Sequence, residues 1–494
     1  MSASPQPDEG LRHVSLRSGV YADSVRLMQV SREIGDRPGV TAVLVAMATP
    51  LNLELAAGMG LAPDGAAKPD QLLIALRATD DAELTAAVAA VEAALAHRER
   101  SGEAQTIPAR TIGAALEDAP DPALAIISVP GRYAAAEAAD AIAAGRSVLI
   151  FSDGVPVEQE VALKRAAHEA GVLVMGPDCG TAIVSGVALG FANVVRRGPV
   201  GLVAASGTGA QQVSCLLDAA GVGVSHVLGV GGRDLSEAVG GLATLDALAA
   251  LAEDPATERV LLVSKPPAPS VAALVGQVSR GLSVPVRSAA LSPDQPDLTA
   301  AVEALLGDLG VAVPRWPSRP GTADAVPAGA VLKGFYSGGT LADEAMLIAA
   351  PVLGDIRSNT PLKPELDLGT DLRATGHVVV DFGDDALTVG RAHPMIDPTL
   401  RLEAIAALAA GGEPAVLLLD VVLGYGADPD PSATLVPALQ ASGLPAVVAL
   451  VGTEADPQGW ARQADALAEA GAAVFASNAA ATRYALSLIG ASDV

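Results

Sequence analysis

The sequence predicts an α/β fold with parallel sheets, and three observations lead to it. Beyond about residue 120, short apolar runs end in turns of small or polar residues and continue into alanine-rich stretches, which is typical of βαβ units. Half of the residues are apolar but only 2% are aromatic, so Ala, Val, Leu and Ile must build the core, as in helices packed on buried parallel strands. The length of 494 residues exceeds one core and favours about three domains.

The first hundred residues show the same alternation over shorter distances. The patterns of apolar residues predict strands at 13–19, 40–49 and 71–79 and helices at 23–34 and 82–95. We therefore expect a small N-terminal α/β sandwich in residues 1–110, closed by a polar, aperiodic linker at 101–110. The first ten residues lack the pattern of a signal peptide and are expected to be a disordered lead.

The rest of the chain divides where its composition changes. The rhythm of strand, turn and helix runs through residues 111–197 and 198–312 and resumes over 328–494. Between them, residues 313–327 are rich in proline and polar side chains and are the best candidate for an interdomain linker. In doubly wound sheets, ligands bind beyond the carboxyl ends of the strands, so functional residues are expected in the turns that follow the strands.

Net charge and cysteine content limit which partners and which cellular compartment are expected. The net charge of −25 disfavours nucleic acid and anionic membranes, which are bound through Lys and Arg, although solubility alone also explains it. No apolar run reaches the roughly eighteen residues of a membrane span. Two cysteines, Cys179 and Cys215, make no disulfide framework or zinc site. We expect a cytoplasmic protein whose partner is a small anionic or phosphorylated metabolite.

Two glycine-rich loops are the strongest candidates for binding that anion. Each follows an apolar strand and leads directly into a helix, where small residues let backbone N–H groups approach an anion and the helix dipole favours negative charge. Neither is a Walker A or GxGxxG motif. The alternative for each is a tight turn with an N-cap, but two copies favour the phosphate site. The predicted phosphate-binding residues are Ser206, Gly207, Thr208, Gly209, Ser337, Gly338, Gly339 and Thr340.

A second polar cluster follows the predicted strand that ends near Asp381. Arg391 and His393 are assigned as catalytic residues that hold an anion or carboxylate, and no metal is assigned. The alternative is a solvated turn with surface ion pairs, but a loop this polar next to a strand end favours function. The residues expected to orient the catalytic pair are Asp381, Asp384, Asp385 and Asp397.

Two basic residues follow neighbouring strands. Arg233, in Gly231-Gly232-Arg233-Asp234, either supplies a phosphate-binding fork or pairs with Asp234 on the surface. Lys265 ends another strand and is assigned as a catalytic residue that adds local positive potential. Cys179 has no base near it in sequence, which favours a buried structural thiol over a nucleophile.

These residues, taken in order, resemble the FdrA family and, more distantly, both subunits of succinyl-CoA synthetase. The resemblance implies a Rossmann-like CoA-binding domain at 111–197 and two flavodoxin-like ligase domains at 198–312 and 328–494. The α subunit is matched by Ala205-Ser206-Gly207-Thr208, and the carboxyl-terminal domain of the β subunit by Ser337-Gly338-Gly339 and Val380-Asp381-Phe382-Gly383. The implied CoA-like cleft contains Pro130, Asp153, Gly154, Pro156, Pro177, Asp178 and Cys179.

The sequence departs from the synthetase in three respects, one of which is that the glutamate expected to orient the phosphorylated histidine is replaced near Ser264-Lys265. No histidine lies between Lys265 and residue 313, where the phosphorylated histidine is expected, and the ATP-grasp half of the β subunit is absent. The family resemblance therefore implies a substrate that arrives activated, such as carbamoyl phosphate, with the loops stabilising the leaving phosphate.

The leading hypothesis is a carbamoyl- or acyl-phosphate-handling transferase subunit, most closely an oxamate carbamoyltransferase component of purine catabolism that interconverts oxalurate plus phosphate with oxamate plus carbamoyl phosphate. One alternative is a CoA-binding relative of NDP-forming acyl-CoA synthetases, with CoA as a possible cofactor. Another is a non-catalytic scaffold. Companion subunits and a homo-oligomer are expected.

Overall fold

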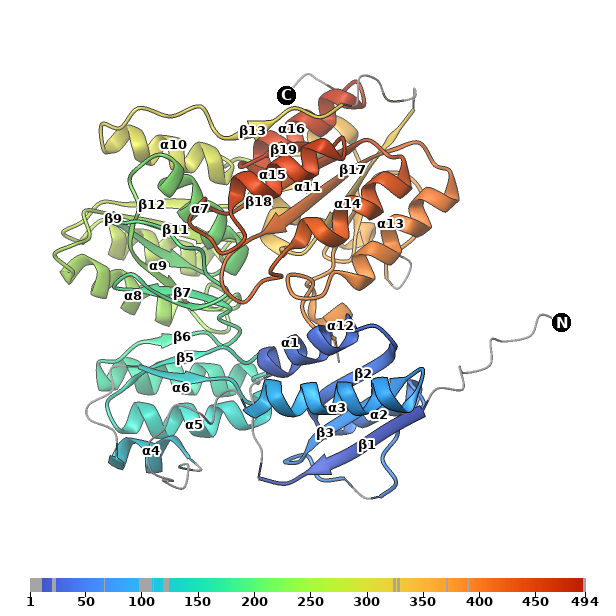
Figure 1. Ribbon diagram of the computed structural model, residues 1–494. Helices are drawn as coiled ribbons and strands as arrows, with labels where there is room; N and C mark the ends of the chain where they lie inside the picture. The colour runs from blue at the N-terminus through green and yellow to red at the C-terminus, as the bar shows by residue number, and fades with distance from the viewer. Residues whose placement is uncertain are drawn as a thin grey trace. The chain divides into compact units, whose positions relative to one another are not determined.

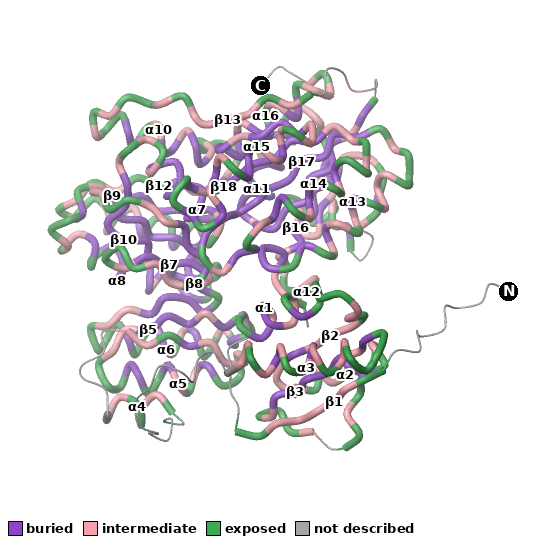
Figure 2. The backbone as a smooth tube through the Cα atoms, viewed as in Figure 1, coloured by how far each residue is buried: buried purple, intermediate pink, exposed green. Residues whose placement is uncertain are grey.

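A computed structural model defines the fold in two compact units. One comprises residues 1–108 with 388–392 and the other residues 109–387 with 393–494, and the units are described separately (Figures 1 and 2). The expected disordered lead and nearly all of the expected linker at 101–110 lie outside the described residues. The described residues are 11–19, 24–65, 67–96, 109, 111–118, 124–322, 326, 329–369, 372–388 and 391–491.

The first unit is a three-stranded antiparallel sheet covered on both faces. Strands β1 (Leu11–Arg17), β2 (Val40–Met47) and β3 (Leu72–Ala78) have the order β1-β3-β2. Alternate residues of β3 face α1 (Ser24–Gly35) and α3 (Asp81–Ala96) on one side and α2 (Pro50–Gly58) on the other. The predicted strands and helices are confirmed. Helix α2 was not predicted, because it is short and lacks an amphipathic pattern.

The second unit begins with a small parallel sheet in the order β4-β5-β6. Strands β4 (Leu124–Ile127), β5 (Ser147–Ile150) and β6 (Val174–Met175) alternate with helices α5 (Gly131–Ala143) and α6 (Val157–Ala170), after the short helix α4 (Ile112–Asp118). Alanines of α5, such as Ala134 and Ala138, pack against Val148 and Ile150, which is the small-residue core that the composition predicts.

A hairpin connects this sheet to the next one. Strands β7 (Thr181–Val184) and β8 (Val187–Gly190) are antiparallel, and β7 pairs with β10. They precede residue 198, the expected start of the first ligase-type domain, but belong to its sheet.

The second sheet contains six strands in the order β12-β11-β9-β10-β7-β8. Its parallel part consists of β9 (Arg197–Ala204), β10 (Val224–Gly229), β11 (Arg259–Ser264) and β12 (Val286–Ala290). The connecting helices are α7 (Gly207–Ala219), α8 (Leu242–Glu253) and α9 (Pro269–Ser279), followed by α10 (Leu298–Asp308). The connection through α7 runs from β9 to β10, whereas those through α8 and α9 run in the opposite direction across the sheet. Because such crossovers are right-handed, α7 covers one face and α8 and α9 the other.

The third sheet repeats this arrangement in the order β13-β19-β18-β17-β14-β16-β15. Its strands are β13 (Ser318–Arg319), β14 (Val331–Tyr336), β15 (Arg357–Ser358), β16 (Val378–Asp381), β17 (Ala415–Val422), β18 (Ala446–Val451) and β19 (Ala473–Phe475). The helical elements are α11 (Gly339–Leu353), η1 (Pro364–Leu366), α12 (Asp385–Thr388), α13 (Thr399–Gly411), α14 (Pro431–Ser442), α15 (Trp460–Glu469) and α16 (Asn478–Leu488). Strand β13 lies inside the expected linker 313–327 and pairs with β19, so this part of the connection is ordered.

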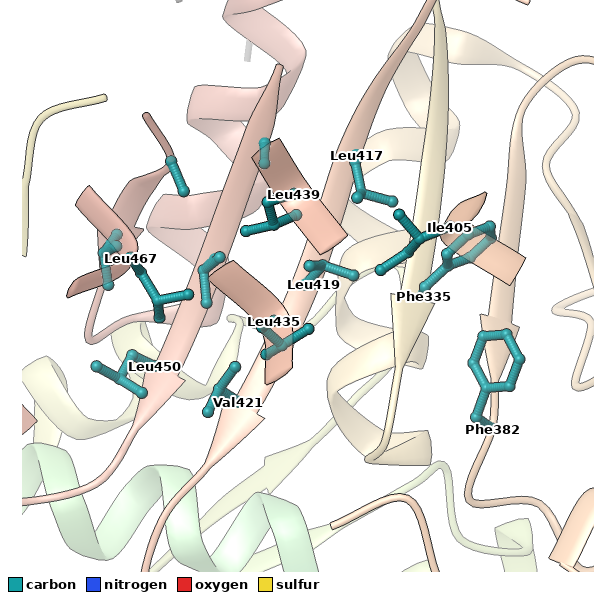
Figure 3. Packing of buried hydrophobic residues seen from close by; sticks show 14 of the residues in the cluster. Phe335, Phe382, Ile405, Leu417, Leu419, Val421, Leu435, Leu439, Leu450 and Leu467 are labelled. Atoms are coloured by element: carbon teal, nitrogen blue, oxygen red, sulfur yellow. The ribbon is translucent and has the colours of Figure 1, made fainter. Parts of the chain in front are cut away.

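The core of the third sheet is aliphatic. Figure 3 shows Leu417 and Leu419 of β17 packed with Ile405 of α13 and with Phe335 of β14. Phe335 and Phe382 make an edge-to-face contact with ring centroids 5.6 Å apart, one of the few aromatic contacts in the unit. The composition predicted this core, since only five phenylalanines are available for the whole chain.

Both predicted loops lie at topological switch points. The connections from β9 and from β14 each begin where the strand order of the sheet reverses, which is where open α/β sheets bind ligands. The mixed α/β fold with parallel sheets is confirmed. No helix in the described part of the chain is long and apolar enough to span a membrane.

Candidate functional site

The two glycine-rich loops meet at the amino-terminal ends of α7 and α11. The Ser206 hydroxyl accepts a hydrogen bond from the Gly209 N–H and thereby caps α7. Its Oγ also lies 2.6 Å from Oγ1 of Thr340, in the first turn of α11. The structure therefore joins two segments that are 134 residues apart in the sequence, and two helix N-termini face each other.

Glycine is required here because the loops touch. A Cβ on Gly338 would lie 2.6 Å from Oγ1 of Thr208, and one on Gly339 would lie 2.5 Å from Oδ2 of Asp381. Neither glycine has a positive φ, so space rather than backbone conformation selects it. Among the described residues, no acceptor bonds the N–H groups of Gly207, Thr208, Gly339 or Thr340. These four donors remain for a ligand.

Asp420, in β17, holds the loop of Ser337 and Gly338 in place. Its buried carboxylate accepts hydrogen bonds from the N–H and hydroxyl of Ser337 and from the Gly338 N–H, at 2.7, 2.8 and 2.9 Å. Arg401 pairs with the same carboxylate at 3.0 Å. Ser337 and Gly338 thus use their N–H groups internally, whereas the sequence predicted all four loop residues as phosphate donors. Sequence reasoning missed Asp420, although a single aspartate in the apolar run of β17 was a signal.

Charged side chains surround the N-terminus of α11. Nζ of Lys265 lies 2.7 Å from Oδ2 of Asp343, and burial raises the pKa of Asp343. The Asp381 carboxylate is 6% exposed and accepts a hydrogen bond from the Gly383 N–H at 2.9 Å. Burial raises the pKa of Asp381 to about 7. Two of the predicted residues, Lys265 and Asp381, therefore lie beside the loop.

His393 also approaches this region. Its Nε2 lies 2.8 Å from the position that a Cβ on Gly383 would occupy, and Oδ1 of Asp381 lies 3.2 Å from the same position. Nδ1 accepts the N–H of Met395 at 3.2 Å, which leaves Nε2 as the protonated nitrogen of the neutral ring. Burial, with the charge of Arg401, lowers the pKa of His393 to about 4. A neutral histidine beside Asp381 is a hydrogen-bond donor and not a cation that holds an anion.

The other predicted residues of this segment lie apart from the two loops or are engaged locally. Arg391 is exposed and belongs to residues 388–392, which group with the first unit, so its role stays a prediction. Asp397 is exposed and accepts hydrogen bonds from the N–H and hydroxyl of Thr399 ahead of α13. Asp384 accepts the N–H of Ala386. No group of three or more potential metal ligands occurs among the described residues.

The predicted CoA-like cleft lies at the carboxyl ends of β4, β5 and β6. Pro130 and Pro156 are the N-caps of α5 and α6, and a Cβ on Gly131 would lie 2.1 Å from the carbonyl oxygen of Asp153. The loop of Gly154 therefore contacts the start of α5. A Cβ on Gly231 would lie 2.5 Å from the carbonyl oxygen of Pro177.

Acidic side chains give this cleft its electrostatic character. Asp178 keeps solvent exposure, yet desolvation and the charges of Asp385 and Asp153 raise its pKa to about 7. Cys179 is fully enclosed, and burial raises the pKa of its thiol to about 12, which agrees with a structural cysteine.

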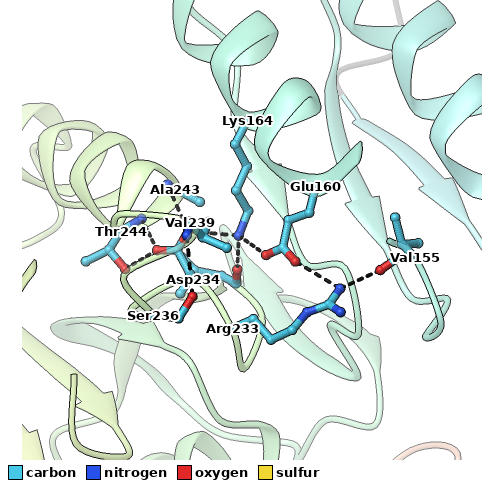
Figure 4. A network of polar contacts seen from close by, with 10 residues as sticks. Val155, Glu160, Lys164, Arg233, Asp234, Ser236, Val239, Ala243 and Thr244 are labelled. Atoms are coloured by element: carbon cyan, nitrogen blue, oxygen red, sulfur yellow. Dashed lines mark hydrogen bonds and ion pairs between the residues drawn. The ribbon is translucent and has the colours of Figure 1, made fainter. Parts of the chain in front are cut away.

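Arg233 is held in place by a buried ionic network (Figure 4). It donates to the carbonyl oxygen of Val155 at 2.7 Å and pairs with Glu160 at 2.9 Å. It does not pair with Asp234, which instead binds Lys164 at 2.8 Å. Lys164 and Asp234 are at most 1% exposed. The side chain of Arg233 is 44% exposed, and its contact with phosphate stays a prediction.

A groove in the described part of the second unit lies apart from these residues. It has a volume of about 550 Å³ and is lined by α9 and β12, with Leu235, Leu262 and Val275 at its base. None of the site residues predicted from the sequence is among its lining residues, so the loops and the residues of the predicted CoA-like cleft remain the candidate site.

Comparison with known proteins agrees with the fold. A family model described as CoA-ligase matches residues 335–488, and one described as the AllF heavy metal-associated domain matches residues 10–110. The fold, the switch-point loops and these matches define an α/β protein with a CoA-ligase domain at residues 335–488.

A full-length relative identifies the family. The uncharacterized protein YahF of Escherichia coli (strain K12) is 38% identical over 496 residues, which covers 94% of this chain and 96% of YahF. The chain belongs to the FdrA family, which includes YahF.

More distant matches are partial. Subunit alpha 1 of the ADP-forming succinate–CoA ligase of Archaeoglobus fulgidus is 35% identical over 144 residues, covering 28% of this chain and 48% of that subunit. The chain thus matches only about half the length of this relative. The structure of dinucleotide-forming acetyl-coenzyme A synthetase 1 of Ca. Korarchaeum cryptofilum, with phosphate and ADP, covers 79% of this chain and 89% of that chain at 16% identity. Its TM-score of 0.32 is too low to support an argument.

Replacing Lys164 by Met is expected to destabilise the protein strongly. The carboxylates of Glu160 and Asp234 would stay buried without their cation, which costs about 3–5 kcal/mol. Denaturant unfolding measures this loss. Replacing Arg287 by Met is the control, since its pair with Asp308 is well exposed and is worth about 1 kcal/mol or less. Equal losses in the two variants would contradict the assignment.

Replacing Asp381 by Asn is expected to stabilise the protein at pH 8 and to have little effect at pH 4. The pKa of Asp381 rises from 3.8 to about 7 on folding, so the native state binds the extra proton and stability falls as pH rises between these values. The gain at pH 8 is at most about 4 kcal/mol. Thermal melting over pH 4–8 tests this, and a pH-independent difference between the two proteins would refute it.

Proposed function

We propose that the chain is a subunit that handles an acyl phosphate and CoA in an enzyme related to NDP-forming acyl-CoA synthetases. The phosphate end of the substrate binds where α7 and α11 meet, and CoA binds at the carboxyl ends of β4, β5 and β6. The observation that supports this most strongly is that two helix N-termini meet here. Among the described residues, no acceptor bonds the N–H groups at these ends, which are those of Gly207, Thr208, Gly339 and Thr340.

The loops suit a leaving phosphate. Attack of a thiol on an acyl phosphate forms a C–S bond and breaks the bond between the acyl carbon and the oxygen that links it to phosphorus. Phosphate leaves and can take up the thiol proton, and negative charge grows on its oxygens as the bond breaks. Fixed backbone donors stabilise such charge without reorganising. They do not titrate, and in a protein with a net charge of −25 they supply positive potential where few cations are free.

The N-termini of α5 and α6 are the proposed contacts for the phosphate groups of CoA. Neither α5 nor α6 has a side-chain cap, so their first N–H groups can bind phosphate oxygens, and Arg233 adds a half-exposed guanidinium. Asp153 and Asp178 oppose an anion on the facing loops. Burial, with the charges of Asp385 and Asp153, raises the pKa of Asp178, so CoA is expected to bind more strongly when Asp178 is protonated.

Carbamoyl phosphate is a second candidate substrate. It is a mixed anhydride like an acyl phosphate, and the observation that favours it is the absence of histidine from residue 265 to residue 313. A chain without a phosphohistidine in that segment has to receive its phosphoryl compound already activated. The acceptor would then be an amide nitrogen, as in oxamate, and CoA would not be needed.

Calorimetric titration with CoA, acetyl phosphate and carbamoyl phosphate is expected to distinguish these functions. The primary proposal predicts binding of CoA and acetyl phosphate, and thioester formation once the companion subunits are added. Binding of carbamoyl phosphate without CoA would replace it by the carbamoyl-transfer function. Binding of CoA without either phosphate would reduce the chain to a CoA-binding protein.

Replacing Gly339 by Ala is expected to weaken binding of inorganic phosphate at least tenfold. The new methyl group would lie 2.5 Å from Oδ2 of Asp381 and displace the end of α11. Gly307→Ala is a matched control, because Gly307 lies within α10 and a Cβ there meets nothing within 4 Å. Unchanged phosphate affinity in a folded Gly339→Ala variant would mean that the loop is an ordinary strand–helix turn and not a phosphate site.

A further inference from the structure

Asp381 places a carboxylate at the helix end that the proposed function assigns to phosphate. Its Oδ2 lies 2.5 Å from the position of a Cβ on Gly339, the first residue of α11. Oδ1 accepts the Gly383 N–H, but no donor among the described residues bonds Oδ2. An almost fully buried side chain therefore directs an oxygen without a partner at the end of α11.

A carboxylate and a phosphate cannot both be fully charged at this position. Like charges within a few ångströms repel strongly where water is excluded. Two carboxyl groups that share a site relieve the same conflict by keeping one proton between them. The conflict here is resolved in the same way if Asp381 carries a proton when the anion is bound.

The neighbouring cations offset the burial of Asp381 only in part, since the charge of Lys265 lowers the pKa of Asp381 but burial raises it more. Lys265, from the end of β11, is paired with Asp343 of α11 at 2.7 Å. Arg401, from α13, is paired with Asp420 of β17 at 3.0 Å. Each cation therefore already has a carboxylate. The titratable and charged groups around Asp381 are Lys265, Asp343, Asp384, His393, Arg401 and Asp420.

We propose that this site binds its phosphate group together with one proton, which resides on Oδ2 of Asp381. The proton comes from solvent, and the carboxyl O–H then donates a hydrogen bond to a phosphate oxygen beside the N–H groups of Gly339 and Thr340. The only covalent bond formed is this carboxyl O–H, and the phosphate group itself is not altered. The proposal rests on the proposed function, because it concerns the same anion.

The ionisation of Asp381 agrees with this role. Burial raises the pKa of Asp381 to about 7 in the free protein, so the protonated form is available near neutral pH. A bound anion raises that pKa further, which by linkage means that anion binding takes up a proton. Above pH 7, each pH unit then weakens anion binding by up to about tenfold.

Sulfate is the probe that tests this most directly. It mimics phosphate but stays a dianion over the whole pH range, so any pH dependence belongs to the protein. Calorimetry from pH 6 to pH 9 is expected to show wild-type affinity falling about tenfold per unit above pH 8. Titrations at pH 8 in buffers of different ionisation enthalpy are expected to show uptake of nearly one proton.

Two variants test whether the proton is bound by Asp381 itself. Asp381→Asn keeps an oxygen for the Gly383 N–H, and we expect it to bind sulfate with no proton uptake and more tightly than the wild type at pH 9. Asp355→Asn, at an exposed aspartate just beyond the C-terminal end of α11, is the control and is expected to behave as the wild type. Thermal melting establishes that both variants are folded.

The outcomes separate the two proposals. Sulfate binding that does not vary with pH in the wild type, or that varies equally in Asp381→Asn, overturns the proton-coupled binding and leaves the proposed function standing. Failure of a folded Asp381→Asn variant to bind sulfate also overturns it. Failure of the wild type to bind sulfate or phosphate at any pH removes the anion site, and both proposals with it.

Discussion

The contact between the ends of α7 and α11 is the constraint on which the rest of the second unit depends. Two helix N-termini carry partial positive charge, and they face each other across the 2.6 Å contact of Ser206 and Thr340. Such an arrangement repels itself unless negative charge lies nearby. Asp343, Asp381 and Asp420 lie around the end of α11, and a bound anion would complete the balance.

A continuous polar interface holds the two helices in this position. Asn193 and the N–H of Val194 bind the carboxylate of Asp456 at 2.8 and 2.6 Å. Gln212 of α7 donates to the carbonyl oxygen of Ala476 and accepts from the Asn478 N–H. These groups are buried and bonded, so separating the second and third sheets would leave several of them unsatisfied. The helix ends therefore form a preorganised frame.

The sequence predicted the local parts of this site and missed the parts that depend on distant residues. Strands, helices and both loops followed from periodicity and from glycine placement. The role of Asp420 was not predictable, because Ser337 lies 83 residues before it. The partner of Arg233 was left open, and the structure selects Glu160 through a loop and helix pairing that no sequence pattern encodes. Arg391 and His393, two positions apart in one polar run, differ in exposure and in compact unit.

The glycines of the second loop set how closely it packs. A Cβ on Gly338 would clash with Thr208, and one on Gly339 with Asp381, so the protein packs tightly beside the N–H groups that we propose bind phosphate. Under that proposal these groups hold the leaving phosphate, and the acyl or carbamoyl carbon of the substrate points away from the helix ends. Other surfaces would then choose the acceptor, which is the reason for proposing companion subunits.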